Sequence, residues 1–108
     1  MIYLTNSFSV HMMPQFNCGE WEDIRFTRIT SQEACRMLKG NTFKSYFGHA
    51  DTVKWLEDRW RMHIHVSRDL AEFRKGDTMI IATVSSKRKW EQGKNPAPAF
   101  KFYLVEYR

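Results

Sequence analysis

The sequence contains little cysteine and no long apolar segment. Cys18 and Cys35 are its only cysteines, and neither belongs to a CxxC pair. Two such thiols cannot form a disulfide framework, so we expect both to be reduced and structural. No run of about 18 apolar residues occurs, which excludes a transmembrane helix. Residues 1–12 also lack the basic start and apolar stretch of a signal peptide. We therefore expect a cytoplasmic protein with no membrane partner.

Internal repeats, low-complexity tracts and domain linkers are also missing. A length of 108 residues fits one domain, spanning residues 1–108. Hydrophobic residues make up 43% and aromatic residues 15% of the chain, enough apolar surface to exclude disorder. Lys and Arg number 17 against 12 Asp and Glu, a net charge of +5. This balance mildly favours an anionic partner such as a nucleotide or nucleic acid.

Strand patterns recur along the chain. Residues 78–84 are apolar throughout, which predicts a central strand covered on both faces. Residues 62–66 alternate between apolar and polar, as in a half-exposed strand, with His63 and His65 on its polar face. Residues 85–98 are polar and contain Gly and Pro, which predicts a long loop. Strands are expected at residues 2–5, 23–28, 43–47, 62–66, 78–84 and 99–107.

Two helices are expected between these strands. Thr30 and Glu33 form a capping box that predicts a helix over residues 31–38, and Gly40 fits a left-handed residue after its end. Residues 48–51 open the second helix, whose core-facing side carries Val53, Leu56 and Trp60. The interleaving predicts an α/β fold: a small single domain with a mixed sheet of about five strands and packed helices.

His49 is the residue best placed for chemistry. It follows a predicted strand and Gly48 and begins a predicted helix. A helix N-terminus offers free backbone N–H groups and a positive dipole end, which together attract phosphate. An imidazole at that place can exchange a proton with a phosphoryl ester near neutral pH. A capping or turn histidine is the alternative.

Other polar residues suit the same chemistry. Arg68 can hold a phosphate bidentately, while Asn6 and Ser9 can bond a ligand or cap a turn. In the loop of residues 85–94, cations suit phosphate contacts and Glu91 can orient or deprotonate a hydroxyl. Trp90 can stack on a base, although a solvated loop is the alternative. His63 and His65 lack a third metal ligand, so no metal site is expected.

Four segments together resemble a known family. Residues 3–10, YLTNSFSV, resemble the start "YLxNxFSxxML" of a family of archaeal-virus and phage proteins. Residues 45–52, SYFGHADT, resemble its central "SxIGHxxT". Residues 66–68 resemble its "xNR" segment, and residues 88–94 resemble its "RLxEGK" loop. The family is the viral ring nucleases, anti-CRISPR enzymes that cleave cyclic tetra-adenylate.

The resemblance implies a homodimer that binds one cyclic oligoadenylate across its two-fold axis and needs no metal or cofactor. The ribose 2′-OH attacks the neighbouring phosphorus and leaves linear products with a 2′,3′-cyclic phosphate. The catalytic candidates are His49, as general acid, and Glu91. The protein would thereby inhibit type III CRISPR immunity, acting in the host cytoplasm if it is viral. The substrate-binding candidates are Asn6, Ser9, Gly48, Arg68, Thr83, Lys87, Arg88 and Trp90.

The sequence departs from the family pattern in the loop. Gln92 separates Glu91 from Gly93, as though one residue were inserted, so either Lys87 or Arg88 takes the place of the family's arginine. Ring size stays open, with cyclic tetra-adenylate favoured. Two alternatives to the enzyme are a sponge that sequesters a cyclic nucleotide without cutting it and a small nucleic-acid-binding protein. Binding to long nucleic acid is the less expected of the two.

Overall fold

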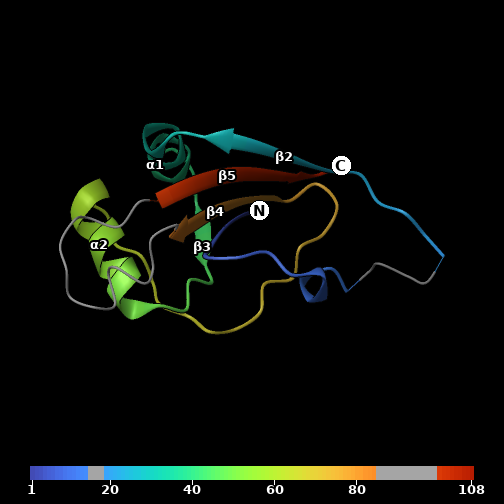
Figure 1. The fold of residues 1–108 in the computed structure, drawn as a ribbon, viewed down its shortest axis with the longest axis horizontal. Coiled ribbons are helices and arrows are strands. Elements are labelled where there is room, and N and C mark those ends of the chain that lie inside the picture. The colour runs from blue at the N-terminus through green and yellow to red at the C-terminus, as the bar shows by residue number, and fades with distance from the viewer. Residues whose placement is uncertain (15–18, 85–99) are drawn as a thin grey trace.

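Five strands form one mixed sheet in the computed structural model, which describes residues 1–14, 19–84 and 100–108 (Figure 1). Two α-helices and one 3-10 helix complete the fold, so the predicted α/β class with a five-stranded mixed sheet is confirmed. The strands are β1 (Ile2–Thr5), β2 (Ile24–Ile29), β3 (Phe43–Ser45), β4 (Thr78–Val84) and β5 (Phe100–Tyr107). The helices are η1 (Val10–Met12), α1 (Ser31–Lys39) and α2 (Ala50–Trp60).

The sheet combines parallel and antiparallel pairs in the order β2-β5-β4-β1-β3. β1 runs parallel to both of its neighbours, pairing Ile2 with Phe43 of β3 and with Thr78 of β4. β5 is antiparallel to β4 and to β2. The carboxyl ends of β1, β3 and β4 therefore meet at one edge, where open α/β sheets bind their ligands. In Figure 1 the arrow of β4 points to this edge, on the side of α2.

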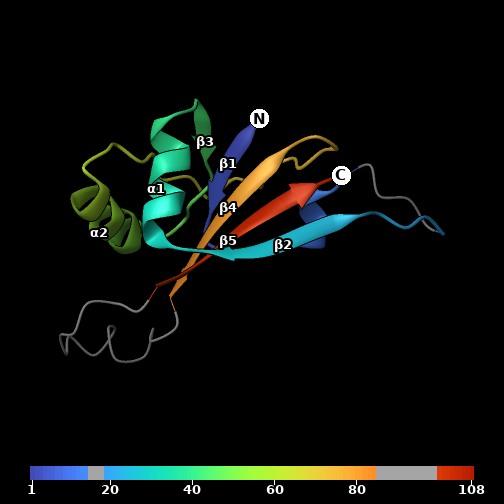
Figure 2. The same cartoon turned by 90° about the horizontal axis from the view of Figure 1, so that it is seen from above.

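Alternation along the strands divides the core between the two faces of the sheet. Leu4, Ile80 and Phe102 pack with α1 and α2, and both helices lie on the same side of the sheet (Figure 2). Their sequence neighbours Tyr3 and Ile81 belong to the second cluster, with Met12 of η1 and Phe73. Because β4 is covered on both sides, its centre is fully buried, as its continuous apolar run predicts.

α1 begins at the predicted capping box. The Glu33 N–H donates to the Thr30 hydroxyl at 3.1 Å, and the Thr30 N–H donates to the Glu33 carboxylate at 3.2 Å. Ala34 and Leu38 anchor the helix in the core. The prediction for Gly40 is wrong: its φ of −81° lies in the right-handed region. A backbone bond from Gly40 to the Arg36 carbonyl closes the helix without a left-handed turn.

The strand predicted over residues 62–66 does not form. Only Val66 bridges to the sheet edge, beside Phe47. The Glu57 carboxylate accepts the Ile64 N–H at 2.8 Å and lies 3.1 Å from His63 Nδ1. A side chain thus takes the backbone donor that a ladder would need, and the segment runs as an irregular connection. Among the described residues no helix is long and apolar enough to cross a membrane.

Candidate functional site

A pocket of about 620 Å³ opens at the carboxyl end of the parallel strands. Its wall contains residues from four separate segments: the end of β1, the start of α2, the end of β4 and the connection after α2. Four predicted site residues meet there. They are Asn6, His49, Arg68 and Thr83.

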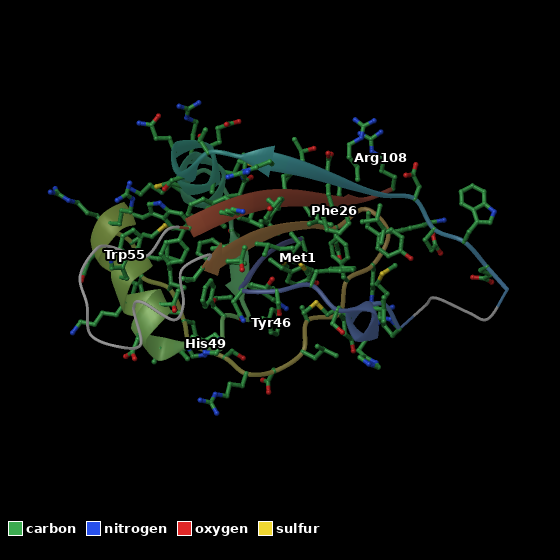
Figure 3. The ribbon with its side chains drawn as sticks, in the orientation of Figure 1. Met1, Phe26, Tyr46, His49, Trp55 and Arg108 are labelled. Atoms are coloured by element: carbon green, nitrogen blue, oxygen red, sulfur yellow. The ribbon has the colours of Figure 1, made fainter. Side chains whose placement is uncertain are left out.

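His49 is the N-cap residue of α2, with φ −108° and ψ 104°. Its carbonyl accepts the Val53 N–H at 3.0 Å, which starts the helix. Its side chain makes no capping hydrogen bond and is exposed. Figure 3 shows His49 beside the first turn of α2, away from Trp55 farther along the same helix. The imidazole is therefore free for a ligand at the positive end of the helix dipole.

Arg68 reaches the pocket through the connection that follows α2. The Ser67 N–H donates to the Phe47 carbonyl at 3.0 Å, next to the bridge between Phe47 and Val66. A Cβ built on Gly48 would lie 3.4 Å from Arg68 Cγ. That distance is an ordinary van der Waals contact, so the two segments lie against each other at Gly48. Gly48 itself does not line the pocket.

Asn6 ties the end of β1 to the same turn. Its Oδ1 accepts the Gly48 N–H at 3.4 Å, a long bond. Asn6 lines the pocket, as does the half-buried Thr83 at the end of the neighbouring strand β4. The pocket thus combines an imidazole, a guanidinium, an amide and a hydroxyl, the set of groups that bind a phosphodiester.

The model of one protein family matches residues 2–95. The chain belongs to the STIV B116-like family. In the solved structures, B116 of Sulfolobus turreted icosahedral virus has the same fold, with a TM-score of 0.73, 21% identity and 97% of each chain covered. No curated protein matches the sequence. The resemblance to a viral family is thus confirmed as far as family and fold.

The remaining predicted residues of this STIV B116-like chain lie elsewhere or outside the described part. Ser9 is the N-cap of η1, where its hydroxyl accepts the His11 N–H at 3.2 Å, and it does not line the pocket. Four predicted residues lie outside the described residues, as does the whole loop predicted over 85–98. They are Lys87, Arg88, Trp90 and Glu91.

Two polar pocket residues were missing from the sequence-based set. Asp51 and Thr52 occupy the first turn of α2 and line the pocket beside His49. Thr52 is buried, whereas the Asp51 carboxylate is exposed. The signal was present, since both follow His49 in the motif-like segment 45–52, but an acidic residue in a first helical turn is ordinarily a dipole partner. Within the described residues no group of three or more His, Cys, Asp or Glu could hold a metal ion.

Proposed function

We propose that the protein is a metal-independent ring nuclease that opens a cyclic oligoadenylate, with cyclic tetra-adenylate as the favoured substrate. One observation carries the proposal: His49, Arg68 and Asn6, distant in sequence, line a single pocket at the carboxyl edge of the parallel strands. A phosphodiester that lies there meets the N-terminus of α2 and a guanidinium together. Membership of a family named after a viral protein supports the link to interference with type III CRISPR immunity.

The proposed reaction needs no group beyond the substrate and the side chains. The ribose 2′-oxygen attacks the adjacent phosphorus, forming the O2′–P bond as the P–O5′ bond breaks. The His49 imidazolium donates its proton to the departing 5′-oxygen, a step that contributes about 10²–10⁴-fold in rate. Arg68 holds the phosphate charge, and the nearby 2′-OH makes orientation a large part of the acceleration. The 2′-OH proton leaves to a base, the role proposed for Glu91.

The loop residues complete the proposal by resemblance. Lys87 or Arg88 would add a second cation on the phosphate, and Trp90 would stack on an adenine. Thr83 would bond the ribose or phosphate from the end of β4, beside Asn6. Ser9 needs no role in this site, because it already caps η1.

A homodimer is part of the proposal. A ring of four identical nucleotides has a two-fold axis that a symmetric pair of subunits can share. Val66 and Leu70 flank Arg68 in the chain and are 40% and 53% exposed. Apolar side chains left in water beside the pocket suit burial against a second copy. Cross-linking or sedimentation would measure the oligomeric state.

The decisive experiment is product analysis with cyclic tetra-adenylate in excess EDTA, for the wild type and His49→Ala. We expect linear products with a 2′,3′-cyclic phosphate from the wild type, and their loss in the variant. Full cleavage by His49→Ala would reject the acid assignment. A bound but intact ring would favour sequestration, and salt-dependent binding of long nucleic acid alone would favour a small nucleic-acid-binding protein.

A further inference from the structure

A second pocket, of about 440 Å³, lies where α2 and the start of α1 meet β2 and β5. Its interior is aromatic. The rings of Trp55 and Phe100 stack with centroids 4.7 Å apart and an interplanar angle of 26°, and Phe102 continues the stack at 5.7 Å from Phe100. Among the described residues it shares no lining residue with the pocket around His49, so it is a separate site.

Three cations and no acidic residue are among the described residues that line this second pocket. They are Arg28, Arg59 and Lys101. All three are exposed, and within the described part of the chain none of them makes an ion pair. Arg28 and Lys101 alternate with Ile29 and Phe102, which pack toward the helices, so their side chains leave the opposite face of the sheet. Arg59 is therefore the cation that lies over the aromatic wall.

Arg59 covers the free face of Trp55. Its Cζ lies 5.1 Å from the centroid of the indole ring. Because Phe100 already stacks on the indole at 4.7 Å, the guanidinium occupies the opposite face. A flat aromatic ligand can replace this guanidinium on the indole face of Trp55. The displaced guanidinium can then bind an anionic group on the same ligand.

The hydroxyls in the second pocket are already occupied. Ser31 Oγ accepts the Trp60 indole N–H at 3.0 Å, and the Thr30 hydroxyl belongs to the capping box with Glu33. The Glu33 carboxylate also disfavours a phosphate at the start of α1. The groups left for a ligand are therefore the aromatic face and the Arg59 guanidinium.

We propose that the second pocket binds a nucleotide, with its base against Trp55 and its phosphate held by Arg59. The volume lies in the usual range of small-ligand sites, about 300–1,000 Å³. Aromatic faces stack every base, while arginine pairs bidentately with phosphate. An acidic peptide would satisfy Arg59 and leave the indole face unused. The proposal does not depend on the ring nuclease activity.

The test measures binding of three probes to the full chain by calorimetry at low salt: adenosine 5′-monophosphate, adenosine, and an eight-nucleotide single-stranded oligoadenylate. We expect Arg59→Gln to weaken binding of the monophosphate about tenfold or more, as loss of a charged hydrogen bond does. Binding of adenosine should be unchanged or tighter. Lys54→Gln, which removes a charge from the same helix outside both pockets, is the matched control and should change the dissociation constant less than about twofold.

The aromatic contribution has its own variants. Trp55→Leu should abolish binding of all three probes, and Trp55→Phe, which keeps a ring, should retain most of it. Trp21, 85% exposed and outside both pockets, supplies the control Trp21→Leu. Thermal melts check that each variant folds. If Trp55→Leu unfolds, the contrast between Arg59→Gln and Lys54→Gln decides alone.

The source of the nucleotide follows from the same titrations. If the oligonucleotide binds more tightly than the monophosphate, and Arg59→Gln reduces the slope of log binding constant against log salt concentration by about 0.7, the ligand is single-stranded nucleic acid. If the monophosphate binds as tightly as the oligonucleotide, the ligand is a free nucleotide. Three results would each overturn the proposal. They are no binding of either phosphate-bearing probe at millimolar concentration, equal competition by an oligoglutamate peptide, and loss of binding in a His49→Ala/Arg68→Gln double variant that keeps Trp55 and Arg59.

Discussion

The two ends of the parallel strands differ in how their polar groups are used. At the amino end, Asp77 accepts the Arg74 N–H at 2.9 Å and lies 3.4 Å from the Met1 ammonium group. At the carboxyl end, the side chains of His49 and Arg68 make no hydrogen bond or ion pair with any described residue. One end uses its charges to hold the fold, and the other leaves them available to a ligand. The difference predicts that mutations at the two ends separate stability from activity.

The largest effect is expected for His49→Ala. We expect turnover of cyclic tetra-adenylate to fall about 10²–10⁴-fold, because the leaving oxygen loses its acid, with the free energy of unfolding changed by less than about 0.5 kcal/mol. Single-turnover kinetics and a denaturant titration measure the two quantities.

The matched control is His63→Ala. His63 is equally an exposed histidine, but it pairs with Glu57 outside the pocket. It should keep wild-type turnover. Equal losses in the two variants would mean that the pocket histidine has no special part in the reaction.

A smaller effect is expected for Arg68→Gln. A guanidinium bonded to phosphate contributes about 1.5–3 kcal/mol, so the dissociation constant for the ring should rise at least tenfold. Arg74→Gln is the control, since Arg74 lies at the amino end and pairs with Glu72 at 2.7 Å. Both arginine variants are made in the His49→Ala background, where the ring stays uncleaved. Equilibrium binding then measures the contribution of Arg68 to affinity alone. Equal affinities for the two arginine variants would remove Arg68 from the site.

The same contrast explains what the sequence could predict. Local patterns were sufficient for the capping box at Thr30, for the buried run of β4 and for His49 at a helix start, because each depends on neighbours within a few residues. Arg68 could be suspected as a phosphate ligand, but its approach to Gly48 depends on the bridge from Val66 to Phe47. That contact joins distant segments, and no local pattern encodes it.

The wrong predictions have the same origin. Residues 62–66 alternate as a strand does, yet the Glu57 carboxylate takes the Ile64 N–H, and the segment leaves the sheet. Gly40 has the residue type of a left-handed cap, yet its backbone stays right-handed. In both places a specific hydrogen-bond partner, invisible to composition and periodicity, decided the backbone.

Asp77→Ala tests the amino end, where we expect a stability effect only. Loss of its bonds to the Arg74 N–H and the Met1 ammonium should cost about 1–2 kcal/mol, a fall in Tm of about 4 °C or more. Ring cleavage by the folded variant should match the wild type. Asp58→Ala, an exposed acid on α2 outside both pockets, is the control and should leave Tm nearly unchanged. Impaired cleavage in folded Asp77→Ala would mean that the two ends are coupled.

The smallest effect concerns alkaline pH. Burial, and then the nearby Asp77 carboxylate, raise the pKa of Tyr3, and burial also raises the pKa of Tyr107. The folded chain therefore holds these phenolic protons after the unfolded chain has lost them. The stabilisation that results is complete below about pH 10, the unfolded pKa, and disappears as the pH rises through the folded values.

Tyr3→Phe removes one titration, so its Tm should fall less steeply than that of the wild type between about pH 10 and 11.5. Tyr103→Phe, on a half-buried tyrosine of β5, is the control and should keep the wild-type slope. A Tyr3→Phe profile parallel to the wild type would show that this phenol does not link the amino-end packing to pH.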